Sequence, residues 1–295
     1  MKAAPFAYFA PDSVDEAVSL LVEHGDDAKV LAGGQSLMPL MALRLAVPAV
    51  VVDINRLPGL DAIERGPDRL RIGALVRHRD IESRNGLADE CPVLGDAVPL
   101  IGHVAIRNRG TVVGSLTHAD PAAEWPAVAI ALDGRVSAVG PRGTRQIDAG
   151  AFFDSYLSNT LAPDELATHL ELRMADGVVG SSFVELARRY GDFALCGVAA
   201  VLRLTPAGTI GDARVVVCGC GPTPLRIADC EPLLAGQRPA ADLFESAADI
   251  VFESVDPLGD IHGSAEYRRH VTRVIARRAL ERAGSRATGE TGGRG

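Results

Sequence analysis

The sequence has few aromatic residues, no long apolar run and no CxxC pair. Phe, Trp and Tyr make up only 4% of its 295 residues, so its core must rely on Leu, Val, Ile and Ala. No apolar run approaches the roughly 18 residues of a membrane helix, and Pro5, Pro11 and Asp12 interrupt any secretory signal. Five cysteines, an odd number, indicate reduced thiols. We therefore expect a cytoplasmic protein without an integral membrane segment.

The charge balance is acidic, with 30 basic and 38 acidic residues and a net charge of −8. An acidic surface repels a phosphate backbone, so we expect no nucleic-acid partner. The length of 295 residues predicts one large or two ordinary domains. Apolar residues make up 47% of the chain, which is ample for a buried core and excludes disorder for most of its length.

Several common functional motifs are missing or incomplete. No Gly-Lys pair exists, which excludes a P-loop, and the histidines show no HxH or HExxH spacing. Cys218 and Cys220 have no second close pair, which favours buried side chains over metal ligands. The run Gly219–Pro224 ends in proline where a dinucleotide fingerprint needs glycine. His118 and Asp120 stay a candidate dyad, although a histidine beside an Asp-Pro turn is more often structural.

Hydrophobic periodicity divides the chain into three parts and a tail, with an α+β fold class. Residues 1–55 read as a βαβ-like unit, and residues 56–177 mix strands with helices. Residues 178–284 predict three antiparallel strands followed by three helices, and residues 285–295 predict a disordered tail.

The predicted strands are Lys29–Ala32, Ala49–Asp53, Arg69–Val76, Val136–Val139, Leu166–Leu172, Ser182–Ala187, Cys196–Leu204 and Ala213–Cys218. A capping box of Ser13 and Glu16 predicts a first helix, which Gly25 ends. The other predicted helices are Leu37–Leu45, Arg77–Arg84, Cys91–Gly102, Ala123–Leu132, Ala228–Ala235, Ala240–Ser254 and Ala265–Ala283, with Arg107–Ser115 predicted as a loop.

Two glycine-containing segments, Ala32–Ser36 and Thr111–Ser115, each follow an apolar segment. Glycine lets backbone N–H groups approach an anion, and Ser or Thr hydroxyls add donors. Two such segments could grip a pyrophosphate from opposite sides, although both could also be ordinary turns. Ser36 lacks the final glycine that a nucleophile elbow requires, so a hydrolase is not favoured.

Four segments, taken together and in this order, resemble one family. They are Ala32–Met41, Ile106–Thr111, Gly114–Pro121 and Gly191–Ala194. Over roughly residues 3–283 the chain resembles the FAD-binding medium subunit of molybdenum hydroxylases, such as aerobic carbon monoxide, nicotine or xanthine dehydrogenases. The resemblance implies a two-subdomain FAD-binding fold of the p-cresol-methylhydroxylase type. A C-terminal three-stranded antiparallel sheet with helices should follow.

The same resemblance implies which residues bind FAD. The phosphate-binding segments fall on Ala32–Leu37 and Thr111–Ser115, and Phe193 should approach the isoalloxazine. The expected cofactor-binding set is Leu31, Ala32, Gly33, Gly34, Gln35, Ser36, Leu37, Ile106, Thr111, Gly114, Ser115, Asp120, Glu124 and Leu166. Within it, Ile106 should lie near the flavin ring, Asp120 and Glu124 near the adenosine half, and Leu166 against the cofactor. Individually, these residues also have core or turn alternatives. No catalytic residue and no metal ligand is expected in this chain.

By resemblance, this oxidoreductase subunit transfers electrons. Molybdenum in a large subunit and two [2Fe–2S] clusters in a small subunit would feed FAD here, and electrons would leave to an external acceptor. We expect a dimer of heterotrimers. The alternatives are a stand-alone FAD-dependent oxidoreductase acting on a small molecule, or a flavin-free assembly protein.

One position departs from the family pattern. The family reads Thr-(Ile/Val)-Gly-Gly-Ser, whereas Val113 stands where the first paired glycine is expected. If the backbone there needs a positive φ, a β-branched residue is strained, but if Val113 points away it is harmless. The strain hypothesis predicts that Val113→Gly changes FAD affinity more than any other return to the family pattern.

Overall fold

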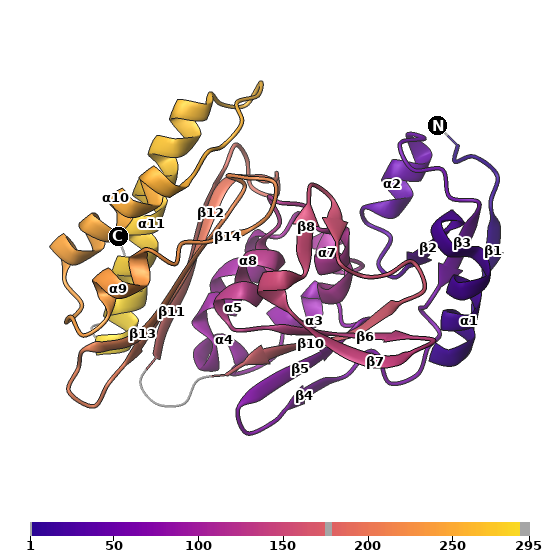
Figure 1. Ribbon diagram of the computed structural model, residues 1–295, viewed down its shortest axis with the longest axis horizontal. Coiled ribbons are helices and arrows are strands. Elements are labelled where there is room, and N and C mark those ends of the chain that lie inside the picture. The colour runs from indigo at the N-terminus through magenta and orange to yellow at the C-terminus, as the bar shows by residue number, and fades with distance from the viewer. Residues whose placement is uncertain (1, 175–178, 290–295) are drawn as a thin grey trace.

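The computed structural model describes residues 2–174 and 179–289, whose elements fall into three neighbouring groups (Figure 1). In the view of Figure 1 the N-terminal group lies at the right, the C-terminal group at the left, and the middle group between them. The predicted boundary between residues 177 and 178 lies outside the described residues.

The N-terminal group is a small parallel sheet with strand order β1-β3-β2. Its elements are β1 (Ala7–Phe9), α1 (Val14–His24), a 3₁₀ turn (Gly25–Asp27), β2 (Ala28–Leu31), α2 (Leu37–Ala42) and β3 (Val50–Asp53). Ser13 caps α1 by accepting a hydrogen bond from the Glu16 N–H at 3.1 Å. The βαβ-like prediction is confirmed, although β1 was not among the predicted strands.

The middle group is an antiparallel sheet with strand order β4-β5-β10-β6-β7, joined to short helices. Its strands are β4 (Ile63–Arg65), β5 (Arg69–Gly73), β6 (Arg135–Gly140), β7 (Gly143–Asp148) and β10 (Leu166–Arg173), with a separate pair β8 (Phe153–Ser155) and β9 (Ser158–Asn159). Its helices are α3 (His78–Glu82), α4 (Leu87–Glu90), α5 (Pro92–Ala97), α6 (Val104–Arg107), α7 (Val112–His118) and α8 (Glu124–Ala131), with 3₁₀ turns at Val98–Leu100 and Ala149–Ala151.

Two predictions for this group are wrong in detail. The single helix predicted over Cys91–Gly102 is divided into α5 and a 3₁₀ turn at Val98–Leu100. Pro99 lies in that turn and has no N–H to continue an α-helical ladder. The loop predicted over Arg107–Ser115 contains the first turn of α7, because Thr111 caps that helix.

The C-terminal group is a second antiparallel sheet, with strand order β11-β12-β13-β14, covered by helices. Its elements are β11 (Val179–Ala187), β12 (Ala194–Leu204), β13 (Ile210–Cys218), β14 (Leu225–Arg226), α9 (Cys230–Leu234), α10 (Ala241–Ser254) and α11 (Ala265–Thr288). The three predicted strands are present, and the two-residue β14 adds a fourth at the edge.

The last helix corrects the predicted tail. Residues 285–288 belong to α11, and residues 290–295 lie outside the described part of the chain. The Arg286 guanidinium donates to the Asp96 carboxylate and to the Ser181 carbonyl at 2.6 Å, and Ala287 is buried. These contacts with α5 and β11 stabilise a last turn whose Gly- and Arg-rich surroundings suggested disorder.

Two hydrophobic cores share the C-terminal sheet. On one face, Ala199 and Val201 of β12 join a core that includes α5, α8 and the middle sheet. On the other, Val198 and Ala200 pack with α9, α10 and α11. Figure 1 shows this sheet standing between the two sets of helices. Because both faces are covered, β12 is apolar along most of its length.

None of the helices in residues 2–174 and 179–289 combines the length and the apolar character needed to cross a membrane.

Candidate functional site

The two glycine-containing segments, far apart in sequence, touch each other. A Cβ atom added to Gly33 would lie 3.0 Å from the backbone nitrogen of Thr111, the first residue of the second segment, and 2.5 Å from the Arg109 carbonyl oxygen just before it. Only a residue without a side chain permits this approach. The first segment links β2 to α2, and the second begins α7 directly after Arg109 and Gly110, so the contact joins the N-terminal and middle groups.

The first segment is an open turn with unused backbone donors. In the described part of the chain, the N–H groups of Gly33, Gly34, Gln35 and Ser36 donate to no protein acceptor. Gly34 has φ +71°, a conformation that glycine adopts without strain. The Gln35 side chain donates to the Gly33 carbonyl at 3.1 Å. Successive free N–H groups on a side-chain-poor turn form a surface suited to an anion.

The second segment is the start of a helix. The Thr111 hydroxyl accepts a hydrogen bond from the Gly114 N–H at 3.1 Å, and the Ser115 N–H donates to the Thr111 carbonyl at 3.0 Å. A Cβ on Gly114 would lie 2.5 Å from that hydroxyl oxygen, so the cap itself requires glycine. The segment therefore uses part of its donor set internally.

Val113 occupies an unstrained position. It is the second residue of α7, its φ lies outside the left-handed region, and its side chain is 2% exposed within the core. A helical backbone does not need glycine, so the strain hypothesis for Val113 is wrong. The side chain contributes burial instead.

His78 supports the second segment from the core. A Cβ on Gly110 would lie 2.9 Å from the His78 ring. The backbone N–H of His78 donates to the Gly110 carbonyl at 3.1 Å. The Trp125 indole donates to the His78 Nδ1 at 3.0 Å. Burial, with the charges of Arg107 and Arg77, lowers the pKa of His78 to about 4. His78 is thus neutral at physiological pH. This agrees with its hydrogen bond to Trp125, because Nδ1 can accept from the indole only when it carries no proton.

The expected ring-side residue Ile106 lies in α6, immediately before the second segment. Its carbonyl accepts from the Gly110 N–H at 2.7 Å. Buried Arg107 anchors this helix by pairing with Glu82 and by donating to the Gly102 carbonyl at 2.9 Å. A Cβ on Gly191 would lie 2.4 Å from the His103 ring, which places the Gly191–Ala194 segment beside α6.

Within that segment, Phe193 is 69% exposed, so its ring is not part of the core. Leu166, the first residue of β10, is by contrast 2% exposed and belongs to the core. The structure therefore favours the core alternative for Leu166 and leaves Phe193 accessible to a ligand.

The expected adenosine-side residues follow α7. The Asp120 carboxylate accepts from the Ala122 N–H at 2.9 Å and shapes the turn into α8. Glu124, the first residue of α8, is only 7% exposed. Burial, with a smaller contribution from the Asp120 carboxylate, raises the pKa of Glu124 to about 7. The candidate pair His118 and Asp120 shows no mutual hydrogen bond among the described residues.

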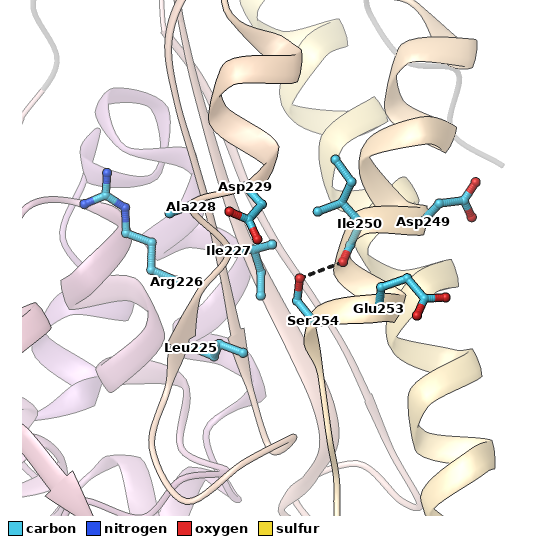
Figure 2. Close-up of a pocket in the computed structure, with 9 residues that line it drawn as sticks. All are labelled: Leu225, Arg226, Ile227, Ala228, Asp229, Asp249, Ile250, Glu253 and Ser254. Atoms are coloured by element: carbon cyan, nitrogen blue, oxygen red, sulfur yellow. Dashed lines mark hydrogen bonds between the residues drawn. The ribbon is translucent and has the colours of Figure 1, made fainter.

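A separate groove lies in the C-terminal group, between the β14–α9 segment and α10 (Figure 2). Figure 2 shows Ile227 and Ile250 within it, and the Ser254 hydroxyl donates to the Ile250 carbonyl at 2.8 Å. None of the residues expected to bind FAD lines this groove.

Asn55, Arg77, His78 and Gly110 were not expected at the site. Gly110 lies inside the motif Ile106–Thr111, and its close approach to the His78 ring explains why a glycine is needed there. Asn55 follows a strand directly, as Asp53-Ile-Asn55, which is a usual place for a functional polar residue. Nothing in the sequence connects Arg77 to either segment.

Comparisons with known proteins cover almost the whole chain. Residues 4–172 match the family model of the FAD binding domain in molybdopterin dehydrogenase, and residues 181–283 match the CO dehydrogenase flavoprotein C-terminal domain. The chain is 39% identical to the 6-hydroxypseudooxynicotine dehydrogenase complex subunit alpha of Paenarthrobacter nicotinovorans, over 97% of both chains. It is also 39% identical to the nicotine 6-hydroxylase medium subunit of the same organism, over 97% of this chain and 100% of that one.

A solved structure agrees with these matches. Carbon monoxide dehydrogenase from Hydrogenophaga pseudoflava, in a form that lacks the Mo-pyranopterin moiety, contains a chain that superposes with a TM-score of 0.93. It shares 35% sequence identity with this chain, and the superposition covers 97% of this chain and 99% of that one.

Proposed function

This chain belongs to the family of FAD-binding medium subunits of molybdenum hydroxylases, and we propose that it passes electrons from iron–sulfur clusters of a partner subunit through FAD to an external acceptor. The observation that carries this proposal is the contact between the two glycine-containing segments, with free N–H groups on the first. FAD supplies the redox chemistry when bound, and the protein supplies position and environment.

The residues present fit FAD. A pyrophosphate needs several convergent donors and close backbone approach, and the turn from Gly33 to Ser36 offers both. The hydroxyls of Ser36 and Ser115 would add donors, while Thr111 would hold the second segment in place through its cap. These are binding and orienting roles, and no proton transfer by this chain is required.

The remaining expected residues would flank the two ends of the cofactor. Ile106 and Phe193, on adjoining segments, would contact the isoalloxazine side, and Leu31 and Leu37 border the first segment. Asp120 and buried Glu124 would lie toward the adenosine half, where hydroxyl groups can donate to a carboxylate. Leu166 would act from the core, by supporting the segments that touch FAD.

We also propose the assembly and its location. The partners would be a large molybdenum-binding subunit and a small [2Fe–2S] subunit, in a dimer of heterotrimers. The printed names of relatives, a complex subunit and a medium subunit, support several subunits. All five cysteines are free and buried, as expected for a cytoplasmic protein. The proposed units are residues 1–55, 56–177 and 178–284.

The proposal is tested by flavin binding to the purified full chain. Apo-protein should bind FAD stoichiometrically, with visible absorbance and quenched flavin fluorescence. Gly34→Val should abolish FAD retention while the protein stays folded, because its Cβ would press on the Leu31 and Met38 side chains, at 3.1 and 3.2 Å, and distort the turn that carries the free N–H groups. Gly59→Val is the matched control, since Gly59 has a similar φ of +76° but open surroundings. A folded wild-type chain without FAD binding would favour the flavin-free alternative, and retention of FAD by Gly34→Val would refute the assigned segment.

Reduction of the bound FAD distinguishes a subunit of a complex from a stand-alone oxidoreductase. If the chain passes electrons within a complex, its bound FAD should stay oxidised with candidate small-molecule substrates alone and be reduced when the partner subunits are added.

A further inference from the structure

Asn55 ties the first glycine-containing segment to the end of β3. Its side-chain amide donates to the Ala32 carbonyl at 2.8 Å and to the Asp53 carboxylate at 2.6 Å. Its own N–H also donates to Asp53, at 2.9 Å, and the Tyr8 hydroxyl donates to the other oxygen of that carboxylate at 2.6 Å. Asn55 is thus held by two partners, the Ala32 carbonyl and an Asp53 carboxylate that Tyr8 also fixes.

Arg77 continues this chain of hydrogen bonds to the second segment. Its Nη2 donates to the Asn55 Oδ1 at 2.6 Å, and its Nη1 donates to the Arg109 carbonyl. The Arg77 backbone is fixed as well, because its N–H donates to Asp80 at 2.8 Å and it pairs with Thr111 across a β-bridge. One planar guanidinium therefore connects the first segment, through Asn55, to the backbone just before the second.

The two carbonyls that these side chains hold lie on either side of the close contact at Gly33. In a trans peptide the C=O and the following N–H point in opposite directions. Fixing the Ala32 carbonyl on Asn55 therefore directs the Gly33 N–H to the opposite side. The Arg109 carbonyl that Arg77 holds is the atom closest to a Cβ on Gly33, at 2.5 Å.

We propose that Arg77 and Asn55 form a strut that sets the position of the two glycine-containing segments relative to each other, and thereby positions the FAD pyrophosphate. The proposal rests on the proposed function. Both are positioning residues, because they act on FAD through the Ala32 and Arg109 carbonyls.

Charge alone does not account for the arrangement. Arg77 is half-buried, and burial together with the charge of Arg109 lowers its pKa, while Asp80 and Asp53 counteract this effect. A residue that served only as a positive charge would not need a fork whose two nitrogens reach two different oxygens. The geometry therefore predicts that lysine cannot replace Arg77.

The test is a FAD titration of the full apo-chain, carried out well below the unfolding temperature of each variant. Arg77→Met and Asn55→Asp should each raise the Kd for FAD by about tenfold to a hundredfold, the range for losing a charge-assisted or positioning hydrogen bond. Asn55→Asp keeps the size of the side chain but cannot donate to the Ala32 carbonyl. Arg84→Met is the control, since it removes an exposed arginine close in sequence and should leave the Kd unchanged.

Two further results separate positioning from charge. Arg77→Lys should bind FAD nearly as weakly as Arg77→Met. The double variant, Arg77→Met with Asn55→Asp, should have a Kd for FAD only slightly above that of whichever single variant binds FAD more weakly. Wild-type affinity in Arg77→Lys, or additive losses in the double variant, would overturn the strut. If Arg77→Met does not fold, Asn55→Asp and Arg77→Lys decide the question.

The outcomes also distinguish the strut from the proposed function. If wild type and Arg84→Met bind FAD, Gly34→Val does not, and the strut variants bind normally, only the strut is wrong. If wild type itself binds no FAD, both fail.

Discussion

The two glycine-containing segments differ in where their backbone N–H groups donate. In Ala32–Ser36 four successive N–H groups have no protein acceptor in the described chain, whereas in Thr111–Ser115 the donors of Gly114 and Ser115 are engaged by Thr111. The first segment is therefore the one that we propose to bind the pyrophosphate, and the second has part of its backbone fixed by its own cap. The comparison explains why a glycine is needed at Gly33 and not at Val113.

The same comparison shows two different uses of glycine. Gly33 has no Cβ because another backbone lies 2.5 Å from where it would be, and Gly34 because its φ is +71°. Gly114 lacks one because the Thr111 hydroxyl occupies that space. Substitutions in the first segment should thus affect FAD binding, and substitutions at the Thr111 cap should act mainly through stability.

The largest effect on FAD binding is expected for Gly33→Ala. The added methyl would push the Arg109 carbonyl away and separate the two segments, at a cost of about 1–3 kcal/mol of unfolding free energy, and FAD retention should be lost. Chemical denaturation and flavin titration measure the two effects. Gly150→Ala is the control, because a Cβ there meets nothing within 4 Å. Unchanged FAD affinity in Gly33→Ala would show that FAD binding does not depend on the close contact between the two segments.

Val113→Gly should lower stability and leave FAD affinity nearly unchanged. Losing a buried side chain and placing glycine in a helix should lower the unfolding free energy by about 2–4 kcal/mol, while FAD affinity changes less than about twofold in the folded protein. Val113→Ala should fall between wild type and Val113→Gly in stability. Markedly tighter FAD binding by Val113→Gly would restore the strain hypothesis.

A pH effect is expected downstream of the second segment, at Glu124. Its folded pKa of about 7 lies above the usual value of 4.5, so the folded state binds the proton more tightly than the unfolded one. Stability should therefore fall as pH rises from about 4.5 to about 7, by on the order of 2 kcal/mol. Half-buried Glu185, whose pKa is raised to about 8 by burial and by the charge of Glu124, should extend this loss of stability to higher pH.

Glu124→Gln checks this effect. The variant should lose most of the decline that wild type shows between pH 4.5 and 7, as measured by denaturation at several pH values. Asp89→Asn, at an exposed position, is the control. Parallel pH profiles for wild type and Glu124→Gln would show that Glu124 is ionised in the fold.

The smallest effect is expected for Thr111→Val, which removes the cap while keeping the shape. Loss of the hydrogen bond to the Gly114 N–H should cost about 1 kcal/mol, and Thr111→Ser should restore it. Thermal unfolding of the two variants measures the difference. A Thr111→Val protein as stable as Thr111→Ser would mean that the cap does not hold the second segment.

The sequence predicted those parts of the fold whose signals are local. The Ser13 cap and the continuous apolar run of β12 could be read because capping and burial leave marks within a few residues. β7 could not, because Gly143–Asp148 is mostly polar and exposed. The first turn of α7 was mistaken for a loop, because Thr and Gly are typical of turns as well as of helix starts.

At the site, the sequence predicted the two glycine-containing segments, but it did not predict the side chains that hold them in place. Arg77 and Asn55 lie 22 residues apart, and Arg77 and Arg109 lie 32 apart. Asn55 follows β3, Arg77 precedes α3 and Arg109 follows α6, so only tertiary packing brings these side chains together. No spacing rule within one element predicts such contacts.

The most direct test of the account is a crystal structure of the full chain with FAD bound. The account predicts pyrophosphate oxygens within hydrogen-bond distance, about 2.7–3.2 Å, of backbone N–H groups between Gly33 and Ser36, with the Arg77–Asn55 contact intact. A pyrophosphate bound elsewhere, with these N–H groups facing solvent, would contradict it.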